Sequence, residues 1–155
     1  FQFFPMEKLN FPNYNLRFKN RENKDFIFDI IRKKWILLTP EEWVRQNCLH
    51  FLIQDKNYPE SLINVEKKFL VNKVSKRYDI IIYSKHGDVL LLVECKAPNI
   101  NLSHSVFDQI GKYNLSLKSK YLMVSNGITH YFCEVNYESN KYLFLEDIPR
   151  FKNLS

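Results

Sequence analysis

The feature that most constrains this chain is a continuous apolar segment that ends in charged residues. Residues 89–93 are all apolar, as in a buried central strand, and Glu94-Cys95-Lys96 follows them directly. Because side chains alternate between the two faces of a strand, Glu94 and Lys96 point one way and Cys95 points the other. Charges at the end of a buried strand are unfavourable unless they are paired or hold a metal ion. The charged end of this strand is therefore predicted to be part of a functional site.

Composition bounds the class of protein. The length of 155 residues predicts one domain, and 45% hydrophobic and 15% aromatic content exclude a disordered chain. Only 3 glycines are present, and neither GxxxxGK[ST] nor GxGxxG occurs, so this chain carries no nucleotide-driven motor. The formal charge of +6 fits a nucleic-acid partner and ordinary solubility about equally well.

The cysteines and the apolar segments indicate the compartment. Cys48, Cys95 and Cys133 lack CxxC spacing, which favours small core residues in a reducing compartment over a disulfide frame or zinc site. No apolar run reaches membrane-spanning length, and no secretory signal is evident. We therefore expect a cytoplasmic protein without a membrane partner. Residues 1–5 are interpreted as an expression remnant ahead of a native start at Met6, or the chain is a fragment.

The hydrophobic pattern predicts the order of elements. An extension over residues 1–25 precedes one domain over 26–149 and a tail over 150–155. A helix begins near Thr39, with Pro40 at its first position and Glu42 completing a capping box. Two short strands are expected before this helix, at 26–31 and 35–38. Three strands are expected after it, at 63–71, 78–83 and 89–95, followed by a second helix at 106–117. A strand at 121–124 and a closing hairpin of strands at 131–135 and 142–145 complete the chain. This order predicts a mixed α/β layer.

Two acids and a lysine on neighbouring strands suggest phosphodiester chemistry. Asp79 lies on the strand before Glu94 and Lys96, and residues 85–88 form a hairpin turn between the two strands. Carboxylate oxygens are suitable ligands for Mg²⁺, which activates water and polarises a phosphate. A nearby ammonium orients water and offsets developing charge. The alternative is a simple salt bridge between Glu94 and Lys96.

These residues resemble the signature of the PD-(D/E)XK nucleases, with Tyr78 in place of the usual proline. Gln109 and Tyr113, four residues apart on one helix face, resemble the QxxxY element of RecB-like nucleases and of type I restriction R subunits. This resemblance implies that Asp79 and Glu94 bind the metal and that Lys96 positions the water. Gln109 and Tyr113 would then act as a second layer of polar groups around the site.

A longer run, roughly residues 26–149, is similar to small proteins related to the N-terminal nuclease domain of type I restriction R subunits. The similar segments are LTPEEWVRQ at 38–46, VEK at 65–67, RYDI at 77–80 and VECKAP at 93–98. The resemblance implies a restriction-endonuclease-like core of helix, three strands, helix and strand, with extra strands at both ends. Because this chain has no helicase motor, translocation is not implied, and a motor or specificity subunit would be a separate partner.

Other charged residues are weaker candidates. Glu66, on the first core strand, is a candidate for a further metal ligand, although its lysine neighbours also fit a solvated edge. Glu42 is explained by the capping box without any catalytic role. The turn formed by Arg32, Lys33 and Lys34 is a candidate contact for a nucleic-acid backbone, although most such runs are solvated faces.

The sequence therefore predicts a Mg²⁺-dependent DNA endonuclease, with Mn²⁺ as a substitute, in a restriction or defence setting. A non-catalytic module for nucleic-acid binding or assembly is the main alternative. A structural α/β domain with a fortuitous signature is a third. The form of the DNA, its sequence and a homodimeric state stay open.

Overall fold

The structure is a computed structural model that describes residues 6–153; the expectation for residues 1–5 lies outside them. The described residues form two α-helices, two sheets and three short helical segments, which are a π-helix at Phe51–Asp55 and 3₁₀-helices at Glu60–Leu62 and Phe151–Asn153. The α-helices are α1 (Pro40–His50) and α2 (His104–Leu117). The small sheet contains β1 (Phe18–Arg21), β2 (Lys24–Asp29) and β3 (Lys34–Leu37). The large sheet contains β4 (Ile63–Val71), β5 (Val74–Tyr83), β6 (Val89–Cys95), β7 (Tyr121–Ser125), β8 (His130–Asn136) and β9 (Lys141–Leu145).

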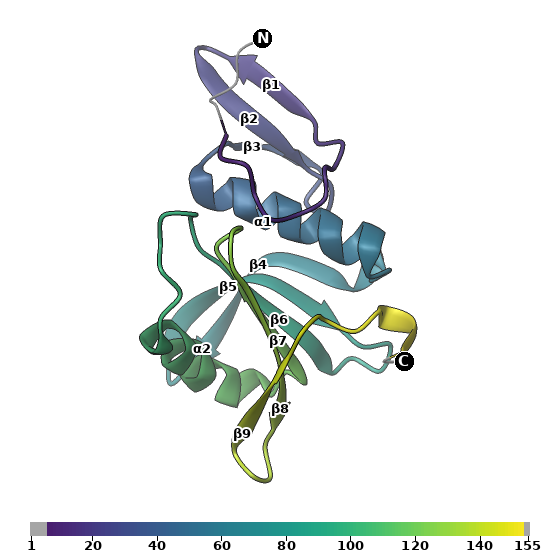
Figure 1. The fold of residues 1–155 in the computed structure, drawn as a ribbon, viewed down its shortest axis with the longest axis vertical. Helices are drawn as coiled ribbons and strands as arrows, with labels where there is room; N and C mark the ends of the chain where they lie inside the picture. The colour runs from purple at the N-terminus through teal and green to yellow at the C-terminus, as the bar shows by residue number, and fades with distance from the viewer. Residues whose placement is uncertain (1–5, 154–155) are drawn as a thin grey trace.

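The large sheet is mixed and is covered by a helix on each face. Its strands follow the chain order from β4 to β9, and every neighbouring pair is antiparallel except β6 and β7. The parallel pair requires a crossover, which α2 supplies. Figure 1 shows α1 between the small sheet and the large one, with α2 across the opposite face of the large sheet. The predicted mixed α/β class is confirmed.

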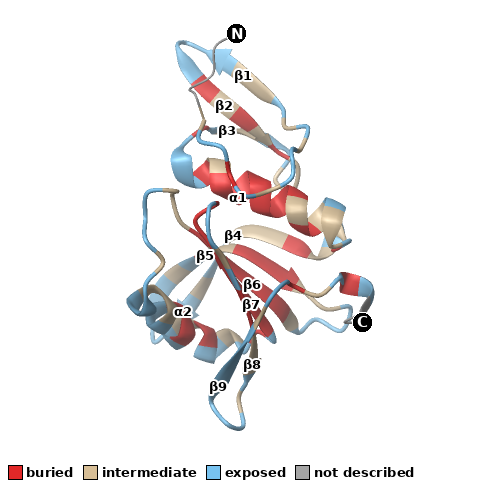
Figure 2. Cartoon of the chain, viewed as in Figure 1, coloured by how far each residue is buried: buried red, intermediate tan, exposed pale blue. Residues whose placement is uncertain are grey.

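Two apolar layers hold the sheet between its helices. The layer under α1 includes Val44, Leu49, Ile80 and Val93, and the layer under α2 includes Ile81, Leu92 and Ile110 among its fully or nearly buried residues. Strands β6 and β7 are buried almost along their whole length (Figure 2). This explains why residues 89–93 read as a continuous apolar run rather than an alternating one.

The predicted start of α1 is confirmed, but the capping box is only half formed. The Thr39 hydroxyl accepts a hydrogen bond from the Glu42 backbone N–H at 3.0 Å, and Pro40 is the first helical residue. The Glu42 carboxylate, however, turns inward and accepts hydrogen bonds from Arg32, Arg45 and Gln46. The interpretation of Glu42 as a capping residue is therefore wrong for its side chain.

Most strand predictions are confirmed within one or two residues. Those at 63–71 and 89–95 agree at both ends, whereas β5 begins four residues earlier than expected. Of the four additional residues only Val74 is apolar, and all four pair with the largely exposed end of β4, so they carry no periodic apolar signal. Strand β1 was not predicted, because its polar and basic residues show no period of two.

The alternation of faces shifts by one residue where β4 and β5 carry Glu66 and Asp79. Ile80 belongs to the layer under α1, whereas Tyr78, two residues earlier, belongs to the layer under α2. Val65 and Phe69 on β4 differ in the same way. Glu66 has a φ of 54°, which is unusual within a strand, and it stands opposite Asp79 between regular pairs. The shift lets Asp79 reach groups on both faces of the sheet.

Candidate active site

Asp79 is held by both of its carboxylate oxygens. Oδ1 accepts a hydrogen bond from Nη2 of Arg45 at 2.7 Å, and Oδ2 accepts one from the backbone N–H of Cys95 at 2.8 Å. The donors come from α1 and from the end of β6. Because two fixed donors define its position, the carboxylate has little rotational freedom. Asp79 therefore joins the helix to the strand that carries Glu94.

Glu94 lies beside Asp79 and is the most perturbed acid of the site. Its pKa is raised to about 8, first by burial and then by the negative charge of Asp79. Lys96 and Lys76 act in the opposite direction without cancelling these effects. Two acids with strongly coupled charges in a half-buried position are a common arrangement at functional sites. The sequence-predicted pair of acids is therefore together in the structure.

Lys96 lies just beyond the end of β6. Its backbone N–H donates to the carbonyl of Ser125 on β7 at 2.8 Å, which fixes the chain at this point. The positive charge of Lys96 influences the pKa of both Glu94 and Glu41. The pKa of Glu41 is raised by burial and by Asp79, so this residue from the start of α1 lies close enough to act electrostatically on the site. Sequence reasoning missed Glu41.

Arg45 is the centre of a buried ionic cluster on the α1 side of Asp79. Its side chain is only 6% exposed and forms ion pairs with Glu42 at 2.6 Å, Asp79 at 2.7 Å and Glu66 at 3.2 Å. Burial disfavours the charge, but the carboxylates of Asp79 and Glu42 outweigh it and raise the pKa of Arg45. Sequence reasoning also missed Arg45, although its position three residues after Glu42 on a helix was a usable signal.

Arg32 extends this cluster toward the small sheet. Its guanidinium pairs with Asp29 at 2.8 Å, Glu66 at 3.0 Å and Glu42 at 3.4 Å. Lys33 and Lys34, its neighbours in the predicted backbone-binding turn, are exposed. Arg32 thus has a set of partners that a DNA phosphate would have to displace. Glu66, the candidate metal ligand, is likewise occupied by guanidinium groups.

Gln109 and Tyr113 share a face of α2 as predicted. The Gln109 amide donates to the Tyr113 hydroxyl at 3.4 Å, and the amine of Lys76 lies 4.0 Å from the centre of the Tyr113 ring. The pKa of Tyr113 is lowered by the Gln109 hydrogen bond and by Lys76, while Glu94 raises it. Lys76, which the sequence did not single out, therefore lies near Tyr113 and also acts electrostatically on Glu94.

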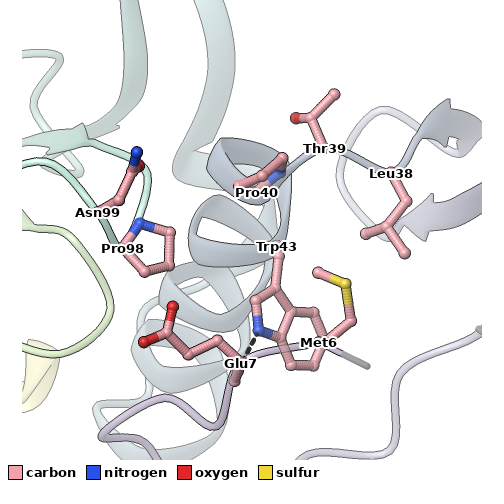
Figure 3. A pocket seen from close by; sticks show the side chains of 8 residues that line it. All are labelled: Met6, Glu7, Leu38, Thr39, Pro40, Trp43, Pro98 and Asn99. Atoms are coloured by element: carbon pink, nitrogen blue, oxygen red, sulfur yellow. Dashed lines mark hydrogen bonds between the residues drawn. The ribbon is translucent and has the colours of Figure 1, made fainter. Parts of the chain in front are cut away.

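A cavity of about 360 Å³ lies beside this group of charges. It opens between the start of α1 and the segment that follows Lys96, and it is lined by Met6, Glu7, Leu38, Thr39, Pro40, Trp43, Pro98 and Asn99. Figure 3 shows the Trp43 indole in its wall, with Nε1 donating to the Glu7 carbonyl at 2.9 Å. None of the sequence-predicted site residues lines this cavity.

The carboxylates fit a divalent cation in chemistry, although they do not form a ready cage. Within residues 6–153, no group of three or more His, Cys, Asp or Glu side chains is arranged to hold a metal ion. Asp79 and Glu94 supply two hard oxygen donors, and water would complete the shell of a Mg²⁺ ion. The raised pKa of Glu94 fits this use, because a divalent cation would relieve its repulsion by Asp79.

Comparison with known proteins gives consistent results. Residues 40–149 match the sequence model of a family described as the N terminus of the type I restriction enzyme R protein. The fold is similar to a fragment from Vibrio vulnificus YJ016 that is described as an HsdR subunit of a type I restriction enzyme, with a TM-score of 0.54 and 19% identity. The similarity covers 76% of this chain and 25% of that one, and at this identity it shows the fold alone. A search of curated proteins finds no significant match. In the part of the chain that is described, no helix is long and apolar enough to cross a membrane.

Proposed function

Because the chain belongs to the family of type I restriction enzyme R protein N termini, we propose that it is a Mg²⁺-dependent nuclease of the PD-(D/E)XK kind that hydrolyses DNA. We include in this proposal that the chain has the restriction-endonuclease-like core, in the order helix, three strands, helix and strand. We also include that Gln109 and Tyr113 on α2 act as the QxxxY element. The setting would be restriction or a related defence system. Motor and specificity functions would come from other domains or subunits, because this chain has no nucleotide-binding motif.

The observation that carries the proposal is the placement of Glu94 beside Asp79, whose carboxylate is fixed by Arg45 and the Cys95 backbone N–H. Burial and the charge of Asp79 raise the pKa of Glu94 to about 8, and the adjacent lysines do not offset this rise. A bound divalent cation would stabilise the ionised form of this carboxylate. The Glu94 proton must leave when the metal binds, so occupancy of the site would rise with pH through this range.

Each residue then has a distinct task. Asp79, oriented by Arg45 and the Cys95 N–H, and Glu94 would hold the ion. A bound Mg²⁺ would polarise the scissile phosphate and lower the pKa of its water. The Lys96 ammonium would orient the attacking water and stabilise charge on the phosphate in the transition state. Lys76 and Tyr113 would position the phosphate from the α2 side.

Cleavage assays test the proposal directly. Supercoiled plasmid and short duplex DNA are incubated with Mg²⁺, Mn²⁺ or EDTA in parallel. We expect nicking or cutting with either ion and none with EDTA. Asp79→Asn should abolish it without unfolding the protein. Cleavage that persists in EDTA or in Asp79→Asn would place the activity elsewhere.

A non-catalytic binding module is the second candidate, and one observation favours it. Asp79 already has a guanidinium partner at 2.7 Å, so part of its charge is balanced without a metal ion. DNA binding by the unchanged protein, with no cleavage under any divalent ion, would support this candidate over the nuclease.

A further inference from the structure

Strands β4 and β5 continue well past the candidate site as a two-stranded ribbon, residues 67–77. Regular pairing runs from Lys67 and Tyr78 to Val71 and Val74. Asn72 and Lys73 form the two-residue turn, and both have positive φ, 50° and 66°. Such turns match the twist of a hairpin. With a rise of about 3.3 Å per residue, the tip lies roughly 20 Å beyond Asp79.

The ribbon concentrates the positive charge of the chain. Its basic residues are Lys67, Lys68, Lys73, Lys76 and Arg77, and residues 67–77 contain no acid. Five positive charges in these eleven residues compare with +6 for all 155. The basic excess of the protein is therefore largely local, which is typical of a nucleic-acid contact rather than of general solubility.

The same ribbon carries the most exposed large apolar side chains of the described residues. Leu70 is 77% exposed and Val74 is 66% exposed, ahead of Leu143 at 61%. Exposed apolar side chains that gather on one element, rather than being scattered singly, are typical of an interaction site. Figure 2 shows the far end of β4 and β5 largely in the colour of exposed residues.

The two faces of the ribbon differ. On one face, Phe69 packs edge-on against Tyr78 at 5.6 Å, and the Tyr78 hydroxyl donates to the Tyr113 carbonyl at 3.2 Å. These contacts anchor the ribbon to α2. On the other face, register places Lys68 beside Arg77 and Leu70 beside Ser75. Arg77 has one distant ion pair, 3.8 Å to Glu66, and stays 58% exposed.

We propose that this ribbon is a DNA-binding arm that enters a groove of duplex DNA next to the phosphate to be cleaved. Two-stranded ribbons fit the grooves of B-DNA, and inserted apolar side chains contact bases and sugars there. Lys68 and Arg77 bind phosphates, and Leu70 makes the apolar contact. The inference rests on the proposed function, because DNA is the polymer that it assigns to the site.

Matched variants separate the arm from other basic and apolar surfaces. Lys68→Ala/Arg77→Ala removes two charges from the ribbon, and Lys33→Ala/Lys34→Ala removes two from the last turn residue before β3 and the first residue of β3. Leu70→Ser is compared with Leu143→Ser on β9, which is similarly exposed. Binding of a fluorescent 20-base-pair duplex is followed by anisotropy in EDTA at several salt concentrations. Circular dichroism and melting temperature confirm folding.

The ribbon variants should weaken binding in two different ways. Loss of Lys68 and Arg77 should reduce the slope of log K against log salt by about 2, because each phosphate contact contributes about 0.9. Leu70→Ser should lower the affinity about tenfold at every salt concentration, with the slope unchanged. The Leu143 variant should bind like the unchanged protein. The Lys33/Lys34 variant, which tests the backbone contact expected from the sequence, should change the slope by less than the Lys68/Arg77 variant.

Two outcomes would overturn the inference in distinguishable ways. If the folded ribbon variants bind like the unchanged protein, or if only Lys33→Ala/Lys34→Ala loses salt dependence, the arm is not the DNA contact, and the nuclease proposal stands. If the unchanged protein binds neither duplex nor single-stranded DNA, the DNA partner is wrong, and the nuclease proposal fails with the arm. Preference for single strands alone would also exclude the groove.

Discussion

Asp79 stands between two groups of charges that differ in how fully they are paired. On the α1 side, Arg45 and Arg32 match the buried carboxylates with ion pairs of 2.6 to 3.4 Å. On the β6 side, Glu94 keeps a pKa near 8 despite two nearby lysines. The difference teaches that charge by itself does not identify a site. A cluster in which every carboxylate is ion-paired, here called balanced, supports the fold, whereas an acid whose charge is disfavoured by burial and by a neighbouring acid is available to a ligand.

The largest effect should come from Lys96 on the unbalanced side. Lys96→Met preserves the apolar stem and removes the ammonium, and we expect cleavage to slow by at least about 100-fold, since positioned proton-transfer and charge-stabilising groups contribute on this scale. DNA binding should change little, because the group acts in the transition state. Single-turnover cleavage and a binding titration on the same variant provide the measurement. Recovery of cleavage at low salt would reassign Lys96 to DNA binding.

Replacing either arginine disrupts the balanced cluster, and Arg32→Met is the matched control for Arg45→Met. Arg45→Met leaves Asp79 without its ion-pair partner, and Arg32→Met leaves Asp29 without one. Glu42 and Glu66 keep the other arginine in each case. Removing one partner of a buried ion pair typically lowers the free energy of unfolding by about 3–5 kcal/mol. Of the two arginines, only Arg45 contacts Asp79. We therefore expect both variants to melt earlier in denaturant. Arg45→Met alone should also alter the Mg²⁺ concentration needed for half-maximal cleavage. Equal metal requirements in the two variants would show that Arg45 does not position Asp79.

The pH dependence of stability tests the contrast between Glu94 and the ion-paired carboxylates. Folding raises the pKa of Glu94 above its usual value, so between about pH 5 and 8 the unfolded chain has lost a proton that the folded chain retains. The contribution of Glu94 to stability therefore falls as the pH rises through this window. Melting temperatures without divalent ions should show this fall in the unchanged protein and a smaller one in Glu94→Gln. Parallel curves for the two proteins would contradict it.

The smallest effect is expected on the α2 side. Gln109→Ala and Tyr113→Phe remove groups that are not proposed to bind the metal, and such outer partners contribute about tenfold at the low end. Activity should fall by more than stability. If the well-folded double variant cleaves at the normal rate, these residues have no part in the mechanism.

The sequence predicted the elements that present the acids, because these elements have strong local signals. The continuous apolar run fixed β6, and Thr39 with Pro40 fixed the start of α1. The proximity of Asp79 and Glu94 followed from a short hairpin between adjacent strands. These local signals cannot predict contacts between residues far apart in the sequence. No local pattern shows that Arg32 turns inward or that Lys76 contacts Tyr113.

The shift of faces at Glu66 and Asp79 was also beyond sequence reasoning. Strict alternation is the rule for strands, and a glutamate in the left-handed region within a strand has no sequence signal. The same holds for the ribbon: its basic residues were visible, but without the extended β5 they read as a solvated edge. The predicted phosphate contact was assigned to Arg32, Lys33 and Lys34 for the same reason.

The most direct test of the central claim is Mn²⁺ binding, measured by electron paramagnetic resonance at pH 8. Asp79→Asn is compared with Asp29→Asn, which removes a buried carboxylate from the balanced cluster without touching Glu94. The account predicts one Mn²⁺ site in the unchanged protein, its loss in Asp79→Asn and its retention in folded Asp29→Asn. Equal Mn²⁺ affinity in the unchanged protein and Asp79→Asn, or no bound Mn²⁺ in either, would contradict the account.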